Sequence, residues 1–135
     1  MLDIARVYLG AVNNMFPATQ PLALPYIFRD EGHMRRVCDG DIGHDILQAF
    51  ERRGLIGLAF YDSGFRSMYN ARHPIHTPGD MRDLKVRVPR ADIFIRTLEA
   101  MGANPTPIPF GEVFTGLQTH LIDAAENNWA TFQST

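Results

Sequence analysis

Short runs of β-forming residues alternate along this chain with helical segments, and this alternation restricts the possible folds more than any other feature. Strands are expected at residues 4–12, 55–60, 65–69, 84–89 and 121–126. Helices are expected at residues 31–38, 41–54, 91–101 and 111–119, with another beginning at 128–129. Strands separated by helices predict an α/β architecture with parallel sheets.

Capping residues and side-chain alternation refine this prediction. Asp41 is an N-cap candidate, and Gly54 is well placed to end the helix that follows it. The segment 77–80 (Thr-Pro-Gly-Asp) has the Thr cap, first-turn Pro and acid of a helix start. In the run 84–89, the alternating pattern places Arg87 on the face opposite the apolar residues. The turn at residues 62–64 is the best candidate for a boundary between two lobes.

Composition excludes several functional classes. The 135 residues are 45% hydrophobic, enough for a buried core, and carry 13 basic against 15 acidic residues. A net charge of −2 without a basic stripe argues against nucleic-acid binding. The longest uncharged apolar run, residues 55–61, is too short for direct membrane insertion. The first residues lack the pattern of a signal peptide, so the chain is expected to be cytoplasmic or to lack its true amino terminus.

The side chains that usually carry catalysis or bind metals form no recognisable pattern. His73 and His76 flank Pro74 and have no acid or Cys partner in the sequence, which favours surface loop histidines over a metal site. Ser63 lacks the glycine pattern of a nucleophile elbow and is interpreted as a turn residue. Cys38, the single cysteine, cannot form an internal disulfide. We therefore expect no catalytic residue, no metal and no cofactor.

Two polar residues near strand ends are candidate ligand contacts. Ligands bind beyond the carboxyl ends of strands in open parallel sheets, and Arg87 and Asn127 are both placed there. Together they could bind one carboxylate, the Arg through two parallel hydrogen bonds. Because 12 of the 13 basic residues are Arg, position alone leaves this role open.

A longer set of segments resembles, in order and spacing, the signature of the solute-binding proteins of TRAP-type (tripartite ATP-independent periplasmic) transporters. The segments are 84–89 (Leu-Lys-Val-Arg-Val-Pro), 101–114 (Met-Gly-Ala-Asn-Pro-Thr-Pro-Ile-Pro-Phe-Gly-Glu-Val-Phe), 117–118 and 123–129 (Asp-Ala-Ala-Glu-Asn-Asn-Trp). Residues 6–7, 24–29, 60–66 and 74–81 are also similar to the family. The resemblance covers essentially the whole chain. One departure is Ala124, at a point where family members often have glycine.

The resemblance implies roles for individual residues. Arg87 matches the arginine that pairs with the ligand carboxylate, and Asn127 matches the asparagine that orients it. Arg66 matches a second polar contact, and Phe110 matches an aromatic wall of the pocket. Trp129 is near enough in sequence to line the same site, although core packing is the alternative for this residue.

The family implies a periplasmic-binding-protein-like architecture of two α/β lobes that close over the ligand. Residues 1–64 would form part of the first lobe, and residues 65–135 part of the second, which carries the carboxylate-binding residues. The expected function is capture of a small organic carboxylate in the periplasm and delivery to the TRAP membrane permease subunits, without enzymatic turnover.

Family members extend beyond this segment at both ends, so the isolated 135 residues are expected to be partly molten. Two alternatives remain open at this point. The chain could be a small α/β enzyme that acts on an anionic substrate, or an orphan fragment without independent activity.

Overall fold

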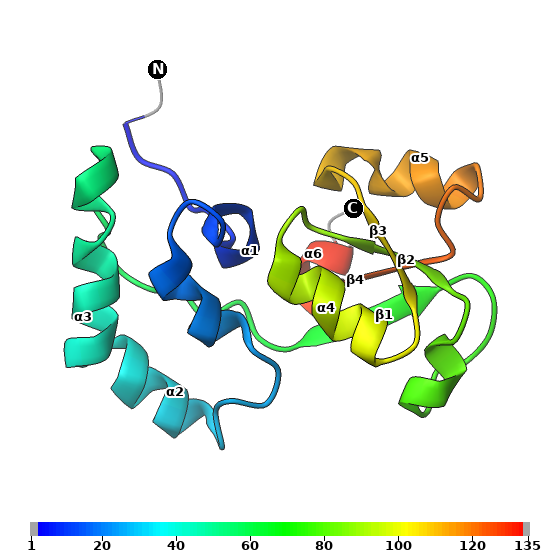
Figure 1. The fold of residues 1–135 in the computed structure, drawn as a ribbon, viewed down its shortest axis with the longest axis horizontal. Helices are drawn as coiled ribbons and strands as arrows, with labels where there is room; N and C mark the ends of the chain where they lie inside the picture. The colour runs from blue at the N-terminus through cyan, green and yellow to red at the C-terminus, as the bar shows by residue number, and fades with distance from the viewer. Residues whose placement is uncertain (1–2, 134–135) are drawn as a thin grey trace. The chain divides into compact units, whose positions relative to one another are not determined.

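The computed structural model describes residues 3–133, and the chain divides into two compact units, Met1–Asp62 and Ser63–Thr135. Figure 1 shows helices alone in the first unit and a sheet with helices in the second. The fold is mixed α/β, as the alternation of elements predicts.

The first unit consists of short helices. They are α1 (Leu9–Val12), the 3₁₀ segment η1 (Pro17–Ala23), α2 (Glu31–Cys38), α3 (Asp41–Gln48) and the 3₁₀ turn η2 (Glu51–Arg53). The bounds of α2 agree with the sequence prediction. Asp30 caps α2, since its Oδ1 accepts the His33 N–H at 2.6 Å. Helices α2 and α3 cross closely at Gly43, where an added Cβ would lie 1.8 Å from the Cys38 carbonyl oxygen.

Two details of the helix prediction need correction. Asp41 is the first residue of α3, and Gly40 takes the N-cap position. Gly54 ends the turn η2 with a left-handed φ of 74°, because α3 itself has already ended at Gln48.

The strands predicted at residues 4–12 and 55–60 are wrong for this structure. Residues 9–12 form α1, while residues 4–8 and 55–60 belong to no helix or strand. Ile56 is 78% exposed and Leu58 70%, so this apolar run is covered on neither face. A strand needs hydrogen bonds from a neighbouring strand, and residues 3–62 contain none that could supply them.

The second unit is built on a four-stranded sheet of order β1-β4-β2-β3. Its strands are β1 (Arg66–Asn70), β2 (Lys85–Val88), β3 (Asn104–Pro107) and β4 (Ala124–Asn128). Strand β2 is parallel to β3 and β4, but β1 is antiparallel to β4. The sheet is therefore mixed, which corrects the expectation of a purely parallel one. Strand β3 was not predicted either, and its two prolines are tolerated because it lies at the sheet edge.

Both faces of this sheet are covered by helices. On one face, α4 (Asp92–Ala100) contributes Leu98 to a core cluster with Val86, Val88 and Ala124. On the other, α5 (Val113–Gln118) contributes Val113 to a cluster with Ile122 and Ala125. The neighbours Ala124 and Ala125 belong to different clusters because side chains alternate along a strand. Apolar burial on both faces is the main force that holds the sheet together.

Three shorter elements complete the second unit: η3 (Pro78–Met81), η4 (Phe110–Glu112) and α6 (Trp129–Gln133). The capping box predicted at Thr77 and Asp80 is present, although it begins a 3₁₀ turn. Asp80 accepts the backbone N–H groups of His76 and Thr77, and these hydrogen bonds lower the pKa of its carboxyl. None of the helices within residues 3–133 is long and apolar enough to cross a membrane.

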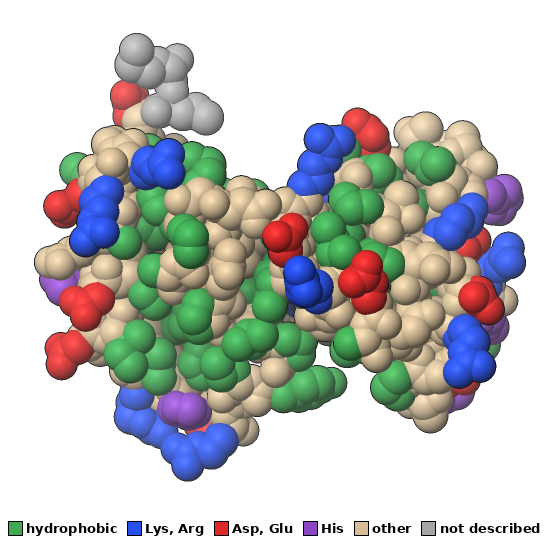
Figure 2. Space-filling model, in the orientation of Figure 1, with side chains coloured by type: hydrophobic (Ala, Val, Ile, Leu, Met, Phe, Trp, Pro, Cys, Tyr) green, Lys and Arg blue, Asp and Glu red, His purple; other side chains and the backbone are tan. Residues whose placement is uncertain are grey.

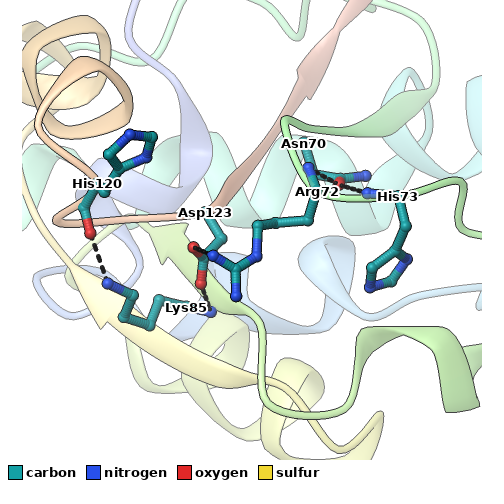
Figure 3. Close-up of polar contacts among 6 residues, drawn as sticks. All are labelled: Asn70, Arg72, His73, Lys85, His120 and Asp123. Carbon is teal, nitrogen blue, oxygen red and sulfur yellow. Dashed lines mark hydrogen bonds and ion pairs between the residues drawn. The ribbon is translucent and has the colours of Figure 1, made fainter.

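Asp123 links the amino-terminal end of β2 to the segment that follows β1 (Figure 3). Its buried carboxylate accepts the Lys85 backbone N–H at 3.0 Å and lies 3.6 Å from the Arg72 guanidinium. The Asp123 backbone N–H donates to the Lys85 carbonyl at 2.8 Å, and the Lys85 ammonium donates to the His120 carbonyl. These contacts hold β2 in line with the start of β4.

We expect Asp123→Ala in the full-length gene product to lower the free energy of unfolding by about 1–3 kcal/mol, because the buried Lys85 N–H loses its acceptor. Asp123→Asn should lose less, since its amide oxygen can still accept this hydrogen bond. Urea denaturation of the three proteins measures the difference. Equal unfolding free energies for wild type and Asp123→Ala would contradict the structural role of this carboxylate.

Candidate carboxylate-binding site

The topology of the sheet brings the predicted site residues to one edge. Strands β2, β3 and β4 are parallel, so their carboxyl ends meet there, and the antiparallel β1 begins at the same edge. The residues at this edge are Arg66 at the start of β1, Arg87 near the end of β2, Phe110 after β3, Asn127 near the end of β4, and Trp129 directly after it.

Arg87 is a buried cation with a defined orientation. It is only 6% exposed, and its Nε donates to the Ile108 carbonyl at 3.0 Å. Its Cζ also lies 5.7 Å from the centre of the Phe110 ring, within range of a cation–π interaction. In the sheet, Arg87 is in register with Ala125, whose small side chain leaves room above β4. A guanidinium in such surroundings suits a bound anion, since burial strengthens electrostatic attraction.

Asn127 lies on the same face of the sheet as Arg87. Arg87 is beside Ala125, and Asn127 is two residues further along β4, so both side chains extend toward the α5 side. Asn127 is buried, and its Oδ1 accepts the Asn128 backbone N–H at 2.9 Å. This hydrogen bond fixes the orientation of the amide at the end of the strand.

Arg66 lies on the opposite face of the sheet, which the sequence pattern did not show. It is in register with Asn128, on the side of Met68 and α4. Its Nε is paired with Glu126 Oε2, its Nη2 donates to the Glu126 carbonyl at 3.1 Å, and its Cζ lies 5.9 Å from the Phe94 ring centre. The two arginines therefore reach the same edge from different sides of β4.

Glu126 and Tyr69 are site neighbours that the sequence analysis missed. The signal for Glu126 was a single acid inside the otherwise uncharged run 124–128. Tyr69 flanks Ala125 on the face of Arg87. Burial raises the pKa of the Tyr69 hydroxyl, the charge of Arg87 opposes this rise, and the charge of Glu126 adds to it. The phenol therefore stays neutral at physiological pH and can donate or accept a hydrogen bond.

Trp129 and Phe110 line the outer part of this edge. Trp129 is 61% exposed and stacks on Phe132, with ring centres 5.3 Å apart, and Phe132 in turn contacts Tyr69. Core packing thus does not account for Trp129. Asn128 Oδ1 accepts the Thr131 N–H at 2.8 Å and so caps α6 next to Trp129.

The arrangement offers hydrogen-bond donors, positive charge and aromatic surface. Within residues 3–133, no three His, Cys, Asp or Glu side chains gather in a group that could ligate a metal ion. The chemistry of this edge fits an anion with an adjoining apolar or ring surface.

The chain was compared with known proteins. The family described as DctP, bacterial extracellular solute-binding protein, family 7, matches residues 1–135. A solute-binding protein of Chromohalobacter salexigens is 41% identical over 133 residues, which are 98% of this chain and 40% of that protein.

Two solved structures of TRAP periplasmic solute-binding proteins are also similar. The protein of Xanthobacter autotrophicus Py2, with bound β-D-galacturonate, has a TM-score of 0.86 and 50% identity and covers 91% of this chain. The protein of a Bradyrhizobium species, in complex with D-galacturonate, has a TM-score of 0.83 and 52% identity and covers 87% of it. The matched regions are 41% and 39% of those chains, so this chain spans about two-fifths of the length of its relatives. The chain belongs to the DctP family, family 7 of the bacterial extracellular solute-binding proteins, which serve TRAP transporters.

Proposed function

We propose that the full-length protein is the periplasmic solute-binding protein of a TRAP-type transporter, which captures a small organic carboxylate and delivers it to the membrane permease subunits. The observation that carries this proposal is the buried Arg87. Its guanidinium is held between the Ile108 carbonyl and the Phe110 ring at a strand-end edge, with Asn127 on the same face.

Each residue of the edge has a distinct task in this proposal. Arg87 binds the ligand carboxylate through two parallel N–H···O bonds, each contributing about 1.5–3 kcal/mol. Asn127 orients the same carboxylate with a weaker neutral hydrogen bond. Phe110 and Trp129 form apolar walls, and Arg66 contacts a polar group elsewhere on the ligand.

The ligand that we propose to test first is a hexuronate. The structures from Xanthobacter and Bradyrhizobium, at 50% and 52% identity, both hold galacturonate. A sugar acid combines one carboxylate with several hydroxyls, and this matches a site with one buried cation, neutral hydrogen-bonding groups and aromatic surface.

We also propose that residues 1–64 belong to the first lobe of the binding protein and residues 65–135 to the second. The second lobe then carries all five ligand contacts that we assign here. Binding proceeds without turnover, so the rival function, a small α/β enzyme with Arg87 as substrate anchor, predicts a different outcome when ligand is added.

Ligand binding can be measured through Trp129, the single tryptophan of the 135 residues. In the full-length gene product, which we would purify and refold to remove bound ligand, D-galacturonate should bind by calorimetry and change the tryptophan emission. The sugar acid should be recovered unchanged, as chromatography would show. Conversion of the ligand to a product would favour the enzyme, and no binding of any carboxylate in a panel that includes succinate would overturn the proposal.

A further inference from the structure

The ion pair between Arg66 and Glu126 gives Arg66 a place that the side chain could not keep by itself. Glu126 contacts the guanidinium twice, because Oε2 accepts Nε and the backbone carbonyl accepts Nη2 at 3.1 Å. Two contacts on different nitrogens set the plane of the guanidinium as well as its position. The Phe94 ring, 5.9 Å from Cζ, limits movement on a third side.

We propose that Glu126 is the positioning residue for Arg66 in ligand binding, an inference that rests on the function proposed above. A free arginine side chain populates many rotamers, and ordering it on ligand binding would reduce the affinity. Glu126 orders the side chain before the ligand arrives. It acts through Arg66 and needs no contact with the ligand carboxylate, which its own negative charge would repel.

The burial of Glu126 supports a selected role over a fortuitous surface pair. Its side chain is 6% exposed, whereas that of Arg66 is 27% exposed, so the carboxylate lies inside and the cation extends toward the edge. Among residues 3–133, Glu126 Oε1 is buried and has no hydrogen-bond partner. A buried carboxylate with one unsatisfied oxygen is costly for stability alone. Its retention is explained if the orientation of Arg66 is what it provides.

The pairing also divides the work between the two arginines. Glu126 offsets the charge of Arg66, while Arg87 is anchored by a neutral carbonyl and a ring. Arg66 then acts mainly as a directional hydrogen-bond donor, and Arg87 supplies the attraction for the carboxylate.

A double-mutant cycle tests this inference, with D-galacturonate as the probe, or succinate if the wild type binds only that. In the full-length gene product, Glu126→Gln should raise the Kd by about tenfold, a typical coupling between residues in contact. Arg66→Met should raise it at least as much. In the Arg66→Met background, Glu126→Gln should then change the Kd by less than about twofold, because no side chain is left to position.

Glu99→Gln is the matched control, since Glu99 is exposed on α4 and should leave the Kd unchanged. Thermal melts separate stability from affinity. The inference is overturned if Glu126→Gln lowers only the melting temperature, or if it raises the Kd equally with and without Arg66.

If Glu126→Gln does not fold, Arg66→Lys serves instead, because lysine keeps the charge but loses the two-point contact. An unchanged Kd in Arg66→Lys would then overturn the inference. Wild type that binds no carboxylate at all would instead refute the proposed function, so the two failures are distinguishable.

Discussion

Arg87→Ala in the full-length gene product should weaken carboxylate binding by a few hundredfold to a few thousandfold. Removing one partner of a buried ion pair costs about 3–5 kcal/mol, and each 1.4 kcal/mol is a factor of about ten in the Kd. Arg87 is 6% exposed, so water replaces the lost guanidinium poorly. Isothermal titration calorimetry with D-galacturonate measures the effect.

Three further variants make this test specific. Arg87→Lys should also bind poorly, because an ammonium cannot form two parallel hydrogen bonds with a carboxylate. Asn127→Ala should lose less, since a neutral hydrogen bond contributes about 0.5–1.5 kcal/mol. Arg96→Ala is the matched control, because Arg96 is exposed on α4. A well-folded Arg87→Ala protein within tenfold of the wild-type Kd would remove Arg87 from the site.

Residues 1–62 expressed alone should show no cooperative thermal transition and should bind a hydrophobic dye such as ANS. This unit exposes much apolar surface even within the whole chain, and Figure 2 shows apolar side chains over much of its visible face. Its largest exposed apolar residues include Ile4, Tyr26, Ile56, Leu58 and Tyr61. Each such side chain left in water forgoes about 1.5–3 kcal/mol of burial, against a total stability of only about 5–15 kcal/mol for a domain.

Residues 63–135 provide the comparison for this experiment. This unit has core clusters on both faces of its sheet, so it should retain more cooperative structure than residues 1–62 under the same conditions. Calorimetric melts of both segments, together with circular dichroism, test the difference. A sharp melt of residues 1–62 would show that its few buried side chains, such as Phe16 and Ile46, are sufficient for folding.

Local sequence signals predicted the elements whose structure depends on nearby residues. The helix at 31–38, the capping box at Thr77 and Asp80, and the strand around Arg87 all depend on hydrogen bonds or alternation within a few residues. The same signals failed for residues 4–12 and 55–60, where a strand requires a partner from a distant part of the chain. They also failed for β3, because its prolines look like loop signals until its edge position is known.

The sequence by itself determined which residue types stand at the ends of β2 and β4, and its resemblance to a family predicted which of them bind ligand. Only the tertiary structure decided which strands are neighbours. The antiparallel pairing of β1 with β4 brings Arg66 to the same edge as Arg87 but on the opposite face, and it gives Arg66 the carboxylate of Glu126 as a partner. The physical reason is that strand order and direction are set by long-range hydrogen bonds and burial on both faces of the sheet, which no local pattern of residues encodes.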